Sequence, residues 1–79
     1  MNINGKVFVV TGGASGLGAA TATYLIGQGA KVIMVDMNHA LGEEMQRHLG
    51  EKSKFVQLDV TDEVAVEAFF KSVHGQASL

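Results

Sequence analysis

The chain has 79 residues, enough for one small domain, and its six basic and eight acidic residues give a formal charge of −2. This balance provides no basic surface for nucleic acid or for an anionic membrane. The lack of cysteine excludes disulfides and cysteine-based zinc sites, and no apolar run approaches the ~20 residues of a membrane span.

The first predicted strand, Lys6–Thr11, is a short segment rich in β-branched residues that leads directly into a pair of glycines. Such a continuous apolar run is typical of a strand that is buried on both faces. A helix is predicted from Gly16 to Gln28, because this segment is rich in alanine and leucine and Gly29 provides a stop.

The second predicted strand, Ala30–Asp36, has the same continuous apolar pattern. Asn38 is suited to cap a second helix that reaches about Leu49, since apolar residues recur there at helical spacing. Gly50 is expected to end this helix.

The third predicted strand, Lys54–Val60, is weaker because polar residues interrupt it. Thr61 is predicted to cap a third helix. The residues expected to form the buried face of that helix are Val66, Phe69, Phe70 and Val73. Strands that alternate with helices over short connections predict a parallel sheet with right-handed crossovers.

The junction between the first strand and the first helix reads Thr11-Gly12-Gly13-Ala14-Ser15-Gly16-Leu17-Gly18. The unpaired N–H groups and the dipole of a helix N-terminus attract a phosphate there. Glycines allow a sharp turn, a close approach to a pyrophosphate and tight helix packing, and we assign these roles to Gly12, Gly16 and Gly18 in that order. The residue after Gly18 is Ala19, where a P-loop requires lysine.

An acid follows at the expected distance from this turn. Asp36 ends the second predicted strand eighteen residues after Gly18, close to the ~20 expected for a carboxylate that binds ribose hydroxyls. The sequence therefore predicts an α/β fold, namely the N-terminal βαβαβα half of a Rossmann-type doubly wound parallel sheet. Residues 1–79 would form a partial dinucleotide-binding domain.

At these residues the chain resembles the classical short-chain dehydrogenase/reductase family, whose cofactor motif matches Thr11, Gly12, Gly16 and Gly18. Within that family, the turn and Gly27–Ala30 are similar to 3-hydroxyacyl-CoA and hydroxysteroid dehydrogenases. The resemblance implies NAD as cofactor, with an acid that selects NAD and a pair of residues that contact adenine. The candidate cofactor-binding residues are Gly12, Ser15, Gly16, Leu17, Gly18, Asp36, Asp59 and Val60.

The resemblance also implies an oxidoreductase that transfers a hydride between NAD(H) and an alcohol or carbonyl substrate. The family's Asn-Asn-Ala-Gly segment, catalytic serine and Tyr-x-x-x-Lys pair do not occur in the sequence. The one tyrosine, Tyr24, lies in the first predicted helix, with Gln28 four residues further on. We therefore interpret the chain as a truncated portion of such an enzyme, with no catalytic residue, no metal site and no activity of its own.

Two alternatives remain open: a non-catalytic nucleotide-binding module, and an interaction fragment that depends on a partner chain. An open edge at Lys6–Thr11 predicts self-association or a homo-oligomer. The first six residues show neither a signal-peptide nor a transit-peptide pattern. We therefore expect a cytoplasmic protein, with the mitochondrial matrix as the alternative compartment.

Overall fold

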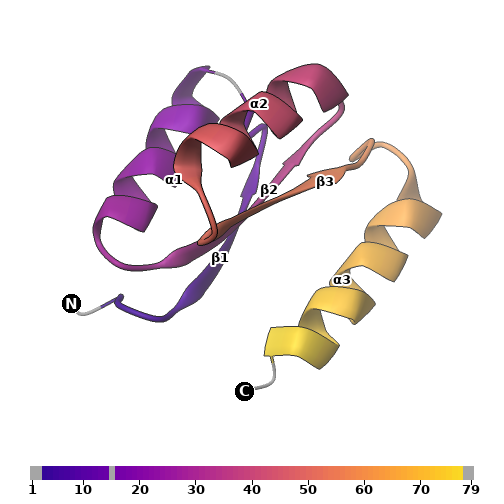
Figure 1. Cartoon of the computed structure of the whole chain (residues 1–79). Coiled ribbons are helices and arrows are strands. Elements are labelled where there is room, and N and C mark those ends of the chain that lie inside the picture. Colours follow the sequence, from indigo (N-terminus) through magenta and orange to yellow (C-terminus); the bar gives the residue numbers. More distant parts are fainter. Residues whose placement is uncertain (1–2, 15, 78–79) are drawn as a thin grey trace.

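Strands and helices alternate along the whole chain (Figure 1). The computed structural model describes residues 3–14 and 16–77, with side chains as far as residue 72. All three predicted strands and all three predicted helices are present, with ends shifted by a few residues. The elements are β1 (Val7–Thr11), α1 (Gly16–Gly27), β2 (Lys31–Asp36), α2 (His39–Leu49), β3 (Ser53–Gln57) and α3 (Glu63–Ala77).

The three strands form one parallel sheet in the order β1-β2-β3. Val9 of β1 pairs with Ile33, and Met34 of β2 pairs with Phe55 of β3. The central strand is buried from Val32 to Val35. Its position between two neighbours and two layers of helix explains its unbroken apolar sequence.

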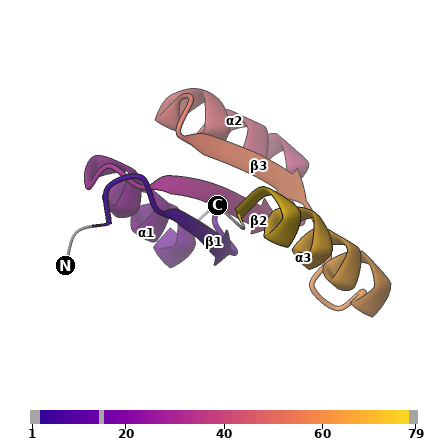
Figure 2. The same ribbon diagram turned by 90° about the horizontal axis from the view of Figure 1, so that it is seen from below.

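Helices cover both faces of the sheet. In Figure 1, α1 and α2 lie together on one side and α3 lies on the other, and Figure 2 shows α3 separated from both. Successive side chains of β2 point to opposite faces, so Val32 and Met34 pack with α1 and α2, while Ile33 and Val35 pack towards α3. The core is therefore two thin apolar layers divided by the sheet.

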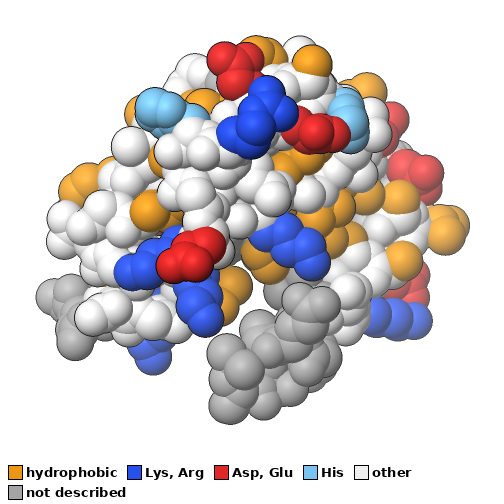
Figure 3. Space-filling view, viewed as in Figure 1, with side chains coloured by type: hydrophobic (Ala, Val, Ile, Leu, Met, Phe, Trp, Pro, Cys, Tyr) orange, Lys and Arg blue, Asp and Glu red, His pale blue; other side chains and the backbone are white. Residues whose placement is uncertain are grey.

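The second helix begins and ends as the sequence predicts. The side chain of Asn38 accepts a hydrogen bond from the N–H of Leu41 at 3.0 Å, and Gly50 follows the last residue of the helix. Gly42 brings α2 close to the sheet, because a Cβ at this position would overlap the ring of Phe55. Figure 3 shows charged and histidine side chains over α2, on its outer face.

The third strand and helix differ from the sequence prediction at their junction. β3 ends at Gln57 rather than at Val60. Thr61 does not cap α3, because its N–H and hydroxyl both donate to Asp59. The cap is Asp62, whose carboxylate accepts the N–H of Ala65 at 3.1 Å.

The predicted buried face of α3 is also only partly correct. Val66 and Phe69 pack against the sheet, whereas Phe70 is exposed. The side chain of Val73 lies outside the described residues. Among the helices that the structure describes, none combines the length and apolar character needed to cross a membrane.

Candidate functional site

The turn after β1 is tied by its backbone to the end of β2. The N–H groups of Gly12 and Gly13 donate to the carbonyl oxygen of Val35, at 2.7 and 3.4 Å. The next N–H, that of Ala14, donates to Oδ2 of Asp36 at 3.2 Å. Three consecutive N–H groups of the turn therefore have acceptors at the carboxyl end of the neighbouring strand.

Two of the glycines in the turn are required by backbone conformation. Gly12 has φ of +67° and Gly16 has φ of +58°, both in the left-handed region that side chains disfavour. A Cβ at either position would meet nothing within 4 Å. Gly16 therefore opens α1 with free space beside its backbone, as a closely approaching ligand would need.

Gly18 is required for a different reason, which is space. A Cβ at Gly18 would overlap the carbonyl oxygen of Gly12 and lie 2.6 Å from its carbonyl carbon and 3.0 Å from Cα of Gly13. The sequence predicts that Gly18 allows tight packing of the helix on the strand. The structure shows that α1 packs at this point on the backbone of the turn itself.

The first turn of α1 provides the N–H groups that an anion could use. These groups have no partner inside the helix, and they lie at the positive end of its dipole. They belong to Gly16, Leu17 and Gly18, three of the candidate residues. Ser15, another candidate, lies outside the described residues.

Asp36 lies at the end of β2 beside this turn. Its Oδ1 accepts the N–H of Asn38 at 2.9 Å, while Oδ2 accepts the N–H of Ala14. Each carboxylate oxygen has a second lone pair. The half-buried carboxylate can therefore still accept hydrogen bonds from a pair of hydroxyl groups.

Asp59 is brought to the same edge of the sheet by the segment that follows β3. The N–H of Leu58 donates to the carbonyl oxygen of Asp36 at 3.1 Å, which keeps this segment beside the end of β2. The hydroxyl of Thr61 at 2.6 Å, and then its N–H at 2.9 Å, both donate to Oδ1 and lower the pKa of Asp59. Asp59 is therefore ionised at neutral pH, with Oδ2 available to a donor.

Exposed apolar side chains surround these polar groups. Leu17 is 84% exposed, Met37 61% and Val60 58%, and each follows the carboxyl end of a different strand. Val60 also lines a small apolar pocket of about 180 Å³ between the sheet and α3, together with Thr11 and Val35. Such an edge offers both an anion site and an apolar surface for a ring system.

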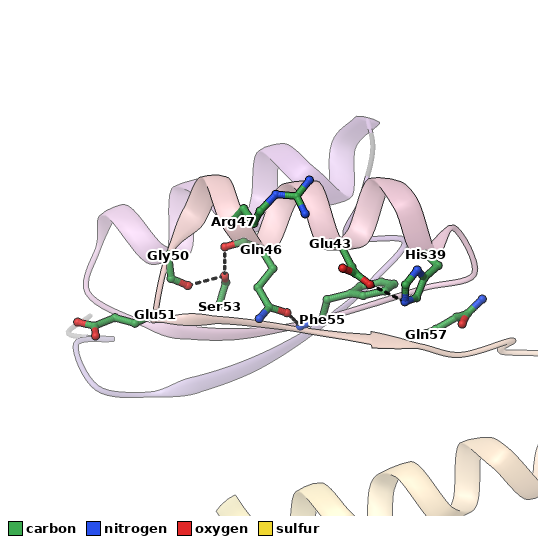
Figure 4. Close-up of a pocket in the computed structure, with 9 residues that line it drawn as sticks. All are labelled: His39, Glu43, Gln46, Arg47, Gly50, Glu51, Ser53, Phe55 and Gln57. Atoms are coloured by element: carbon green, nitrogen blue, oxygen red, sulfur yellow. Dashed lines mark hydrogen bonds and ion pairs between the residues drawn. The ribbon is translucent and has the colours of Figure 1, made fainter.

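A larger groove lies elsewhere, between α2 and the outer edge of β3 (Figure 4). Its polar groups mostly bind one another. His39 pairs with Glu43 at 2.7 Å, and Oε1 of Gln46 accepts the N–H of Phe55 at 2.7 Å. The bond between Gln46 and Phe55 joins α2 to β3, whereas the pair of His39 and Glu43 lies within α2, and these contacts do not form a second candidate site. Among the side chains that the structure describes, which end at residue 72, no group of three potential ligands could hold a metal ion.

A parallel sheet with a glycine-rich turn after β1 and an acid at the end of β2 defines a Rossmann-type α/β unit. A family model described as short chain dehydrogenase matches residues 6–78. The chain belongs to the short-chain dehydrogenase family, as the resemblance in the sequence implies.

Relatives and a solved structure agree with this assignment. The chain is 52% identical over 66 residues to 3-hydroxyacyl-CoA dehydrogenase type-2 of Drosophila melanogaster, covering 84% of this chain and 26% of the relative. It is 49% identical over 61 residues to 3-beta-hydroxysteroid dehydrogenase of Comamonas testosteroni, covering 77% and 24%. The crystal structure of 3-ketoacyl-(acyl-carrier-protein) reductase from Brucella melitensis, complexed with NADH, superposes with a TM-score of 0.87 at 30% identity, covering 96% of this chain and 31% of that one.

The chain spans about a quarter of the length of the relatives that it matches. The subgroup resemblance in the turn is consistent with the names of these relatives. The range matched by the family model, residues 6–78, contains the turn, Asp36 and Asp59.

Proposed function

We propose that this chain is the NAD-binding portion of a short-chain oxidoreductase that transfers a hydride between NAD(H) and an alcohol or carbonyl substrate. The observation that carries the proposal is the carboxylate of Asp36, held against the glycine-rich turn at the N-terminus of α1. The NADH complex of the structurally similar reductase supports it, as do the two hydroxyl-oxidising classes named among the relatives.

The described residues fit a dinucleotide. The N–H groups of Gly16, Leu17 and Gly18 would hold the pyrophosphate, and the open left-handed backbone at Gly16 leaves room for it. The free lone pairs of Asp36 would accept the adenosine ribose hydroxyls. Oδ2 of Asp59 and the exposed side chain of Val60 would contact the adenine.

In such an enzyme the bound cofactor supplies the hydride chemistry. The residues of this chain bind and orient it, and they contribute no acid or base to the reaction. Two features serve this binding. The glycine-rich turn is fixed to β2 by three hydrogen bonds, and the carboxylate of Asp36 accepts a hydrogen bond at each of its oxygens.

NAD is expected to bind more tightly than NADP. A hydrogen bond to a charged group contributes about 1.5–3 kcal/mol, and Asp36 would offer such bonds to a free ribose hydroxyl but repel a phosphate there. Thermal melts with each cofactor test this, because a ligand of the folded state raises the melting temperature by mass action. The preference is expected to weaken in Asp36→Asn and to persist in Glu44→Gln, an exposed residue of α2 that serves as the matched control for loss of one negative charge.

Equal or tighter binding of NADP would show that Asp36 does not select the cofactor. A melt that neither cofactor changes would instead favour a partner-dependent interaction fragment. If this chain binds NAD but the protein that contains it shows no dehydrogenase activity, the non-catalytic nucleotide-binding module would be favoured.

The 79-residue chain alone is expected to show no dehydrogenase activity. General acid–base catalysis contributes about 10²–10⁴-fold, and the sequence contains no Tyr-x-x-x-Lys pair. The measurement is NADH formation from simple secondary alcohols, using protein purified away from the host's dehydrogenases. Turnover that follows the purified chain through a second chromatographic step would contradict this expectation.

A further inference from the structure

We propose that Asp36 has a second role as a positioning residue, which holds the glycine-rich turn in shape before any cofactor binds. This inference rests on the proposed function only for the identity of the ligand. The hydrogen bonds that carry it lie within the cofactor-free chain.

The turn is held by three donors, of which only one depends on a side chain. Gly12 and Gly13 donate to the backbone carbonyl of Val35, so these bonds persist whatever side chains are present. Ala14 donates to the carboxylate of Asp36. Ala14 is 4% exposed, so its N–H has little access to water, and removal of the carboxylate would leave a buried donor without a partner.

The carboxylate is itself fixed in place. Oδ1 accepts the N–H of Asn38, the residue that caps α2, while Oδ2 reaches across to Ala14. The two strand-to-helix junctions of the first β-α-β unit are thereby joined through one side chain. A charge-assisted hydrogen bond of this kind is stronger than a neutral one.

This arrangement also determines which N–H groups an anion can use. Those of Gly12, Gly13 and Ala14 already have protein acceptors, so among the described residues a pyrophosphate would use the N–H groups of the first turn of α1, which begins at Gly16. The hydrogen bond at Ala14 lies two residues before the start of α1 at Gly16. Selection of the ribose and shape of the phosphate site are therefore coupled through Asp36.

The test is amide hydrogen exchange in the cofactor-free chain, comparing the unmutated protein with Asp36→Asn. The site presents two N–H donors, and an amide side chain has a single acceptor oxygen. Exchange at Ala14 is expected to rise by at least about tenfold, the equivalent of one hydrogen bond to a charged group. Exchange at Gly12, which donates to a backbone carbonyl, should stay unchanged, as should both amides in the control Glu44→Gln.

Unchanged exchange at Ala14 in Asp36→Asn would overturn the proposal. If that variant does not fold, the unmutated chain answers the same question by NMR at falling pH. The amide proton of Ala14 is expected to shift together with the side-chain carboxyl carbon of Asp36. If the chemical shift of the Ala14 amide proton does not change when this carboxyl group is protonated, the proposal is overturned as well.

Titration of inorganic pyrophosphate extends the test to the anion site. If Asp36 acted only on the ribose, removing its negative charge would leave pyrophosphate affinity unchanged or raise it. The positioning role predicts a fall of about threefold or more in Asp36→Asn, because the turn loses its anchor at Ala14 while the bonds of Gly12 and Gly13 persist; an unchanged or raised affinity would overturn it. An unmutated chain that binds neither pyrophosphate nor NAD would count against the proposed function alone, since exchange at Ala14 is measured without ligand.

Discussion

Replacement of Gly18 by valine is expected to abolish cofactor binding and to destabilise the chain by about 1–3 kcal/mol, the usual cost of overpacking. The added Cβ would overlap the backbone of Gly12 and press on that of Gly13. Backbone atoms cannot rotate aside as a side chain can, so α1 must move away from the turn. A small domain has little stability in reserve, and the loss is a large share of it.

Gly27→Val, at the other end of α1, is the matched control. Neither glycine has a positive φ, and a Cβ at Gly27 would meet nothing within 4 Å. Urea denaturation measures the free energy of unfolding of both variants, and NAD titration measures their binding. A Gly18→Val protein as stable as Gly27→Val would show that α1 does not press on the turn.

Much of the fold could be predicted because its signals are local. The unbroken apolar run of β2 reflects burial on both faces. The cap at Asn38 was correct because one short polar residue precedes the helical pattern. At the start of α3 the prediction of Thr61 as the cap was wrong, because Thr61 bonds Asp59 and the next residue, Asp62, caps the helix instead.

The contacts within the site required the structure. The sequence places Asp36 beside the turn, but it does not show that the carboxylate bonds Ala14 and Asn38. The need for glycine at position 42 was missed, because the ring of Phe55 that it contacts belongs to another strand. The roles of the candidate residues in binding a cofactor stay predictions until a titration is made.

We expect the chain to self-associate through an open edge of its sheet. In the described residues β1 pairs only with β2, and its side chains from Val7 to Val10 are half-buried and apolar. The backbones of Lys6 and Gly12 form hydrogen bonds with β2. Because successive residues of a strand direct their backbone groups to opposite sides, the N–H and C=O groups of Val7 and Val9 point away from β2, towards the open edge. Such an edge is a template for another strand.

The edge at β3 is better protected. Oε1 of Gln46 accepts the outward N–H of Phe55 at 2.7 Å, and the N–H of Ser53 donates to the carbonyl oxygen of Gly50 at 3.0 Å. A partner strand would have to displace these bonds. We therefore propose that two copies of the chain pair through β1, in a two-fold arrangement that buries the same edge of each.

Light scattering of the 79-residue chain at high micromolar concentration is expected to give the mass of a dimer or larger species. Val7→Pro should weaken this association, because proline is tolerated at the first residue of an edge strand but removes an outward donor. Phe8→Pro, the control, should instead destabilise the fold, because position 8 bonds β2 and proline removes a ladder hydrogen bond. A monomeric mass with a cooperative melt and dispersed amide resonances would show that the chain protects the β1 edge by itself, and the exposed ladder at Val7 and Val9 would then need another explanation.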